Sequence, residues 1–384
     1  MSTTSKTETV PANDEDVVYF HSGSTATYRK INKNTATGNF TSIPTIDLSA
    51  LTSPDHSARK ALAQEIYTAC TTSGFFYASN HGIPEAEQTA IFDTMKRFFL
   101  EVDLQTKMEA HAHRNAAMRG YEPMLETQLD PRTKGDVKEA YSIGDCVIEP
   151  EQDYVGQTGR SPPAHITHPQ NIWPSSTPWF REGMYRYYAA VYPLAMKLVR
   201  LFALAFGLQE DTFDKDFRFP IWGLRALHYP PLPADCEANA NGLGAHADFS
   251  WFTMVLQDTV AGLEVLNRDG VWIEAPPKAG TFVVNVGQYL ERQTNGKFVA
   301  TVHRVRNKTG ERRFSIPFFL SQDPDANIEV LESCLEPGQE KPPPINVGDL
   351  YIRRLLPARK KHPTSIKYRD VPEENWSYDF LYAK

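Results

Sequence analysis

A series of short β segments dominates the chain from about residue 221 onward and limits the folds open to it. The segments are rich in β-branched and aromatic residues, and turns such as Arg268-Asp269-Gly270 separate them. About six strands at this spacing favour a sandwich or a barrel, with helices packed outside. We expect these strands over residues 222–229, 252–257, 263–266, 281–286, 298–306 and 312–320.

The first half of the chain carries helical periodicity instead. Apolar residues at a spacing of three and four predict helices over 57–72 and about 85–100, on either side of an aromatic strand at 75–78. A longer helical stretch should follow Ser176 and run to about Leu208, and Pro193 should kink or split it.

The domain organisation follows from these patterns. Residues 1–40 are polar and without periodicity, so we expect a loosely ordered lead-in. Residues 41–384 should form a single domain with its β core at about 221–325 and a C-terminal helix at about 348–356. The basic residues near that helix are expected at a solvated helix end and loop: Arg353, Arg354, Arg359, Lys360 and Lys361.

Charge and composition exclude several classes of partner. The net charge of −7 does not favour binding to nucleic acid or to an anionic membrane. No membrane span is expected, and the first residues lack the apolar segment of a secretory signal. The cysteines form no CxxC pair, which predicts reduced thiols: Cys70, Cys146, Cys236 and Cys334. We therefore expect a cytoplasmic protein, and its oligomeric state is not predictable.

The segment Gly244-Ala245-His246-Ala247-Asp248 carries the first chemical signal. On an extended strand, His246 and Asp248 would share one face and could chelate a divalent metal. His303 lies in a second stretch that alternates like a strand and could supply the third ligand. Two histidines and one carboxylate on one face suit Fe(II) in oxygen chemistry. By the same alternation, Phe252 should share the ligand face, and Phe249 and Trp251 should point away.

A second signal follows ten residues after His303. Arg313 and Ser315 should share a strand face that looks into the barrel. A buried guanidinium is costly unless it meets an anion, and a planar guanidinium beside a hydroxyl suits a carboxylate. We expect this pair to hold the carboxylate of a cosubstrate.

In this order, the motifs resemble those of the isopenicillin N synthase-like family of Fe(II)/2-oxoglutarate-dependent dioxygenases. The supporting motifs span about residues 43–325: Ile43 to Asp47, Ser73 to Tyr77, Asn80 to Pro84, Arg119 to Tyr121, Asp136 to Glu139, His228 to Pro231, Gly262 to Val265 and Asn285 to Gly287. The resemblance implies a distorted double-stranded β-helix, or jelly roll, with N-terminal and central helices packed outside.

The resemblance also implies roles for single residues. His246, Asp248 and His303 would be the catalytic iron ligands, and Arg313 and Ser315 would hold the distal carboxylate of 2-oxoglutarate. Tyr229 matches a tyrosine that helps to bind this cosubstrate. Leu227 stands where plant members often carry Asn, and Gln288 replaces a frequent Asp.

The reaction implied is the oxidation of a small organic molecule with O2 and 2-oxoglutarate, in the style of enzymes of natural-product biosynthesis. Hydroxylation, desaturation and ring rearrangement all remain open. The candidates for substrate contact are Tyr121, Arg225, Leu227, Phe252 and Phe319. If Arg225 faces the pocket, an anionic or carbonyl-bearing substrate is favoured; otherwise it is a surface or salt-bridged residue.

Two other functions are compatible with the same residues. An iron oxidase could use O2 without 2-oxoglutarate, with Arg313 and Ser315 holding a substrate carboxylate. A catalytically silent jelly-roll binding module could hold a metal for structural reasons.

Overall fold

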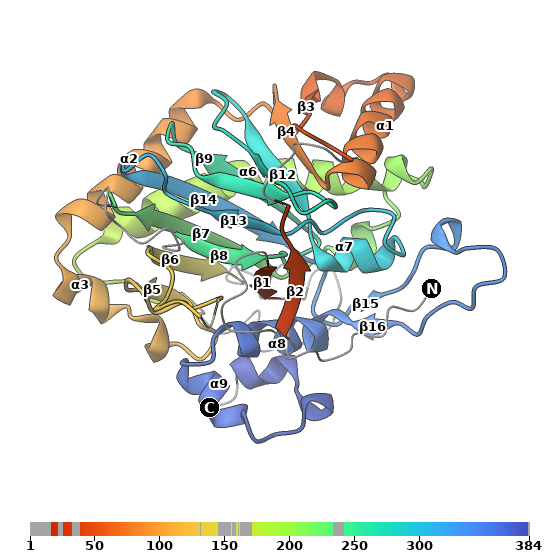
Figure 1. The fold of residues 1–384 in the computed structure, drawn as a ribbon. Coiled ribbons are helices and arrows are strands. Elements are labelled where there is room, and N and C mark those ends of the chain that lie inside the picture. Colours follow the sequence, from red (N-terminus) through yellow and green to blue (C-terminus); the bar gives the residue numbers. More distant parts are fainter. Residues whose placement is uncertain are drawn as a thin grey trace.

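The structure is a computed structural model that describes residues 17–21, 26–32, 39–130, 132–144, 171–232 and 242–382, together with residues 155, 159 and 161. Within these residues, the strands form two large sheets and a small two-stranded sheet, with helices outside them (Figure 1). Cys146 and Cys236 lie outside the described residues, whereas Cys70 and Cys334 are buried free thiols.

The major sheet has eight strands in the order β3-β4-β12-β9-β14-β7-β6-β5. Only β3 and β4 run parallel in it, and the other pairs are antiparallel. The strands are β3 (Thr45–Asp47), β4 (Phe75–Ser79), β12 (Phe282–Val286), β9 (Phe252–Gln257), β14 (Arg313–Leu320), β7 (Trp222–Tyr229), β6 (Glu139–Gly144) and β5 (Gly120–Glu122).

The minor sheet has six strands in the order β11-β10-β13-β8-β1-β2. They are β11 (Trp272–Glu274), β10 (Leu263–Leu266), β13 (His303–Val305), β8 (Leu243–His246), β1 (Val17–His21) and β2 (Ala26–Lys30). Together the two sheets confirm the jelly-roll fold class. The hairpin of β1 and β2 differs from the expected lead-in, because β1 pairs in parallel with the end of β8 and extends the sheet.

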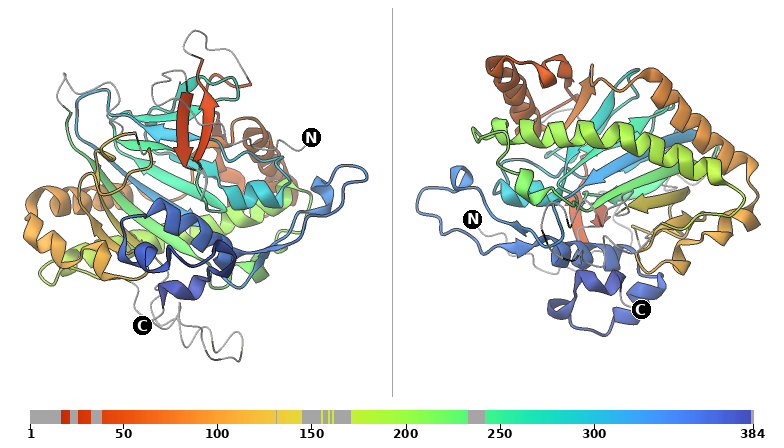
Figure 2. Two further views of the ribbon diagram at one scale, coloured as in Figure 1. Left: turned by 60° about the horizontal axis from the view of Figure 1, so that its bottom comes forward. Right: turned by 180° about the vertical axis from the view of Figure 1, so that it is seen from behind.

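The helices lie outside the sheets (Figure 2). They are α1 (His56–Thr72), α2 (Glu85–Glu101), α3 (Leu104–Glu109), α6 (Pro178–Ala205), α7 (Gln288–Gln293), α8 (Val347–Ala358) and α9 (Pro363–Tyr368). Short 3-10 helices occupy Leu48–Thr52, Ala112–Arg114, Asp214–Asp216, Glu332–Cys334, Glu373–Asn375 and Tyr378–Leu381, and a small hairpin joins β15 (Asn327–Ile328) to β16 (Ile345–Asn346).

Helix α6 is the core helix of the outer layer. It packs on the outer face of the major sheet, where Tyr188 stacks on Trp222 at 4.1 Å between ring centroids and Phe202 contacts Phe252 at 5.4 Å. It continues through Pro193 as one helix rather than two. Its length and apolar composition alone would allow it to cross a membrane, although no membrane span is expected from the sequence; in the structure half of its most apolar segment is buried, and the core includes Met184, Leu198 and Phe202.

Alternation along the central strands separates this helical layer from a cavity between the sheets. On β14, Phe314, Ile316 and Phe318 belong to the core cluster that includes the helices. Arg313, Ser315 and the other intervening residues line the cavity. A strand period of two therefore gives each central strand one face for packing and one for chemistry.

Candidate active site

Strand pairing brings the two predicted histidine ligands together. His246 ends β8, and its partner in the antiparallel ladder is His303 at the start of β13. Directly paired residues have their Cβ atoms about 5 Å apart. The imidazole centroids accordingly lie 4.3 Å from each other, although the residues are far apart in the chain.

The third donor comes from a loop instead of a strand. The chain leaves β8 after His246, and the backbone N–H of Gln288 holds the loop by donating to the Asp248 carbonyl at 2.8 Å. Asp248 Oδ1 lies 3.5 Å from His246 Nε2 and 3.8 Å from His303 Nε2. The expected convergence is present, but not through an extended strand that carries both His246 and Asp248.

Hydrogen bonds orient all three donors. The Nδ1 atom of His246 lies 2.9 Å from the carbonyl of Gly244, and that of His303 lies 3.1 Å from the carbonyl of Thr301. A carbonyl only accepts, so each Nδ1 carries a proton, and the Nε2 atom of the neutral imidazole is then the one that can bind a metal. Asp248 Oδ2 accepts from the Thr253 hydroxyl and the Asn285 amide, both at 2.7 Å, which leaves Oδ1 to face the imidazoles.

The local charges favour the metal-binding forms of these groups. Burial opposes ionisation of Asp248, but the imidazoles of His303 and His246 hold its pKa well below the usual range. Burial and the neighbouring His246 lower the pKa of His303 to about 4. For His246, burial is outweighed by Asp248, which raises the pKa. At neutral pH, the site therefore offers a carboxylate and at least one neutral imidazole.

This donor set fits a divalent iron ion. Its three donor atoms lie within 4.8 Å of one another, and each donor has a hydrogen-bond partner that fixes its orientation. Two imidazoles and one carboxylate are the donors of mononuclear Fe(II) oxygenases, and such partners tune the affinity of the metal.

A buried arginine lies in the same cavity. Arg313, on β14, is 1% exposed. Its guanidinium donates to Ser315 Oγ at 3.1 Å, Gln257 Oε1 at 2.8 Å and the Val260 carbonyl at 3.2 Å. All three acceptors are neutral, and no carboxylate of the described residues forms an ion pair with Arg313. The protein thus keeps a buried positive charge that an anionic ligand can neutralise.

Tyr229 completes this part of the cavity. It pairs with Arg313 across β7 and β14, and the guanidinium carbon lies 5.0 Å from the centroid of its ring. The buried Tyr229 hydroxyl has no hydrogen-bond partner among the described residues. A guanidinium, the Ser315 hydroxyl and a phenol donor on one face fit the carboxylate of a cosubstrate such as 2-oxoglutarate.

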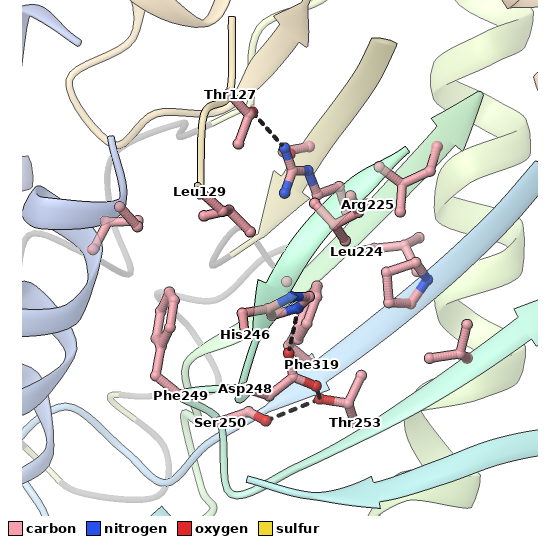
Figure 3. Close-up of a pocket in the computed structure, with 18 of the residues that line it drawn as sticks. Thr127, Leu129, Leu224, Arg225, His246, Asp248, Phe249, Ser250, Thr253 and Phe319 are labelled. Atoms are coloured by element: carbon pink, nitrogen blue, oxygen red, sulfur yellow. Dashed lines mark hydrogen bonds and ion pairs between the residues drawn. The ribbon is translucent and has the colours of Figure 1, made fainter. Parts of the chain in front are cut away.

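The cavity that joins these groups has a volume of about 170 Å³. Figure 3 shows His246 and Asp248 at one side and Arg225 at the other. Besides the metal donors and the arginine face, its lining includes Leu129, Leu227, Phe249, Pro317, Phe319, Tyr351 and Leu355.

The structure separates the five substrate-contact candidates into two groups. Arg225, Leu227 and Phe319 line the cavity. Tyr121 does not line the cavity: it lies on the other face of β5, where its hydroxyl donates to Glu139 Oε2 at 2.5 Å. Phe252 is also a correction, because it begins β9 with its ring against α6. Placing these two residues in the pocket was wrong.

Sequence reasoning missed other cavity residues. Phe249 lines the cavity and meets Tyr351 of α8 at 5.7 Å, because residues 247–251 form a loop in which strand alternation does not apply. Trp251 points away as expected and packs on Phe217 at 5.0 Å. Arg359, expected in solvent, turns inward to the cavity, a placement that no local pattern predicts.

The described residues contain a second group of potential metal donors. His111 and His113 lie 2.7 and 3.3 Å from the two carboxylate oxygens of Glu126. These side chains are more exposed than the first set and satisfy one another by hydrogen bonds. This cluster was not predicted from the sequence, although the His-X-His spacing of residues 111 and 113 is a signal for it.

Comparison with known proteins agrees with this geometry. Residues 43–176 match the model "non-haem dioxygenase in morphine synthesis N-terminal", and residues 222–322 match the 2OG-Fe(II) oxygenase superfamily. The 2-oxoglutarate-Fe(II) type oxidoreductase ppzC of Metarhizium majus is 37% identical over 82% of this chain and 86% of its own. The corresponding oxidoreductase hxnY of Emericella nidulans is 36% identical over 81% of this chain and 88% of its own.

A solved structure supports the same relation. The crystal structure of full-length T7H from Neurospora crassa in complex with alpha-KG has a TM-score of 0.70 and 27% identity, covering 84% of this chain and 99% of that one.

Proposed function

Because the chain belongs to the 2OG-Fe(II) oxygenase superfamily, we propose that it tailors a small organic molecule in natural-product biosynthesis, with His246, Asp248 and His303 as its iron ligands. The chain is a 2-oxoglutarate-dependent Fe(II) oxygenase that oxidises a small molecule with O2. Its product, by hydroxylation, desaturation or ring rearrangement, depends on the substrate.

One observation carries the assignment of the residues. Three oriented donors converge at one end of a cavity, and that cavity also holds a buried arginine with only neutral partners. Both features are explained together if the cavity binds a metal and a carboxylate-bearing cosubstrate. The metal needs the three donors, and the carboxylate needs the guanidinium.

The residues of this chain divide the work. Bound Fe(II) and 2-oxoglutarate supply O2 activation and the oxidation of a substrate C–H bond, with release of succinate and CO2. Arg313 and Ser315 hold the distal carboxylate of the cosubstrate and so fix its orientation, with Tyr229 as a further donor. Phe249, Phe319 and Leu227 exclude water and hold the substrate beside the metal donors.

The natural-product role is supported by the relatives. The model that matches residues 43–176 is described for a dioxygenase in morphine synthesis. Another relative, from Monascus ruber, is the 2-oxoglutarate-dependent dioxygenase citB, 32% identical over 76% of this chain. We also propose a cytoplasmic location, because the described cysteines, Cys70 and Cys334, are free thiols.

The test of the cosubstrate site is Arg313→Met. Loss of the guanidinium should raise the 2-oxoglutarate concentration for half-maximal binding by about 30-fold or more, because a buried charged contact disappears. An anaerobic titration of the Fe(II)-loaded protein, followed by visible absorption, gives this value. Arg200→Met is the matched control, since Arg200 is exposed and pairs with Asp214.

Unchanged 2-oxoglutarate binding in Arg313→Met would contradict the assignment of the anion site. Succinate release under turnover separates the oxygenase from an iron oxidase that uses O2 alone: the proposed function requires one succinate for each product molecule, and product without succinate would remove it.

A further inference from the structure

Three cations meet a single carboxylate beside the cavity. Glu122 of β5 accepts from Lys138 Nζ at 3.3 Å, Arg225 Nη2 at 2.8 Å and Arg359 Nη2 at 3.1 Å. It also accepts from the Thr127 hydroxyl at 2.5 Å, which saturates its two oxygens. Glu122 alone therefore cannot balance the charge of these cations.

The next carboxylate does not balance the cluster either. Asp136 accepts from the backbone N–H of Gly244, and burial raises its pKa to about 6. Glu126, farther out, is paired with His111 and His113. Among the described residues, Glu122 is thus the one carboxylate within ion-pair distance of Arg225 and Arg359, so two guanidinium groups share a single carboxylate. A second anion beside these guanidinium groups would therefore be favourable.

Two of the three cations border the cavity. Arg225 and Arg359 line it, whereas Glu122 and Lys138 lie behind them. Buried Arg225 Nε has no hydrogen-bond partner among the described residues. Neither does the hydroxyl of Ser142, which is 6% exposed and pairs directly with Arg225 across β6 and β7. A hydroxyl and a guanidinium edge therefore sit side by side on the inner face of the sheet.

Arg119 extends this polar wall. Its guanidinium lies over Gly144 and Gly223, which are paired opposite each other two residues beyond Ser142 and Arg225 on β6 and β7. A Cβ atom at residue 144 would come within 2.5 Å of this guanidinium, so a glycine leaves the space that it occupies. Arg119 and Arg225 consequently face the same region of the cavity.

From this wall we infer that the substrate is a small organic acid, whose carboxylate binds Arg225, Ser142 and Arg359 while its reacting carbon lies toward the metal donors. This inference rests on the proposed function and names its substrate class. A planar guanidinium beside a hydroxyl matches a carboxylate. Figure 3 shows Arg225 across the cavity from His246 and Asp248, so the oxidised carbon is remote from the carboxylate.

This site is separate from the one for 2-oxoglutarate. Arg313 and Ser315 lie on β14, whereas Ser142 and Arg225 lie on β6 and β7. Saturation of the first site with a cosubstrate analogue therefore leaves the second open for a test.

The experiment measures the thermal unfolding of the full chain loaded with Mn(II) and saturating N-oxalylglycine. The probes are benzoate, phenylacetate and 3-phenylpropionate, each compared with its neutral primary amide. The acids should raise the unfolding midpoint at concentrations about tenfold or more below those of the amides, because an amide carries no negative charge to pair with the two guanidinium groups.

The variants locate the effect. Arg225→Met and Arg359→Met should each reduce the preference for acid over amide to about onefold, and the melting curve itself reports whether the variant is folded. Arg186→Met is the matched control and should retain the preference, because Arg186 is exposed and pairs with Glu87 outside the cavity.

Equal shifts by acids and amides in the unmodified protein, or no shift by either, would overturn the inference. So would a preference for acids that survives in both Arg225→Met and Arg359→Met, because the cluster would then be a structural ion network. Failure of the proposed function would give a different result. In that case N-oxalylglycine alone would not raise the unfolding midpoint of the Mn(II)-loaded chain.

Discussion

At the scale of single residues, the metal donors depend on the hydrogen bonds behind them. Thr253 and Asn285 both donate to Asp248 Oδ2, so its other oxygen faces the imidazoles. These partners lie on β9 and β12 of the major sheet, and they tie the loop of Asp248 to the rigid part of the molecule. The orientation of a donor therefore matters as much as its identity.

Removal of the Thr253 hydroxyl tests this dependence. Thr253→Val keeps the shape of the side chain but deletes one donor at 2.7 Å, so the affinity for Fe(II) should fall by about tenfold or more. Anaerobic metal titration measures the change. Thr68→Val on the exposed face of α1 is the control. An affinity equal to that of the unmodified protein would show that Thr253 does not support the metal site.

The residues of the metal site could be predicted from the sequence more readily than those of the pocket. Arg313 and Ser315 share a cavity-facing strand face, as alternation along β14 predicted. Phe249 could not be placed by alternation, because the chain leaves its strand after His246. Arg359 could not be placed either, since only the tertiary position of Glu122 explains why it turns inward.

At the scale of elements, the pairing of β8 with β13 creates the site and the aromatic layer behind it stabilises the strands. Trp251 lies at the centre of that layer: its ring is fully buried against Phe202, Phe213 and Phe217, and its indole N–H donates to Gln293 at 2.7 Å. The side chain thus joins α6, the segment after it and the loop of the metal site.

Trp251→Ala should lower the free energy of unfolding by about 3–5 kcal/mol, because a large cavity would form and Gln293 would lose its partner. Chemical denaturation measures the loss. Trp376→Ala is the control: this residue is partly buried and lies outside the β core, so its loss should lower the free energy of unfolding by less. A loss below about 1 kcal/mol for Trp251→Ala would contradict a central packing role.

The elements themselves were predictable where periodicity was strong. The helices expected at 57–72 and 85–100 and the strands at 222–229 and 252–257 agree closely with the structure. Strands β5 and β6 were not predicted, because glycines and turn residues interrupt this part of the chain. Their strand conformation depends on pairing with neighbours distant in the chain, which local propensity does not contain.

At the scale of the whole molecule, the fold buries some groups at a cost in stability. Asp323 follows β14, and its carboxylate accepts from the backbone N–H of Phe219 at 2.7 Å. Burial is the main reason that its pKa rises to about 7. The folded state therefore holds a proton that the unfolded chain releases near pH 4.

This raised pKa predicts the sign of a pH effect. Between about pH 4 and pH 7 the folded state binds more protons at Asp323 than the unfolded state does, so its contribution to stability falls as the pH rises. In Asp323→Asn, the free energy of unfolding should therefore decrease less between pH 4 and pH 7, by up to about 2–4 kcal/mol. Denaturation at pH 5 and pH 8 compares the two slopes, and equal slopes in both proteins would exclude the effect.

The metal centre depends on the convergence of three side chains, and anaerobic Fe(II) binding tests this convergence most directly. With 2-oxoglutarate present, the unmodified protein should bind one Fe(II) per chain and develop a visible charge-transfer band. Asp248→Ala, in a folded protein, should lose both. Undiminished Fe(II) binding with the same band in Asp248→Ala would contradict the assignment of the metal centre.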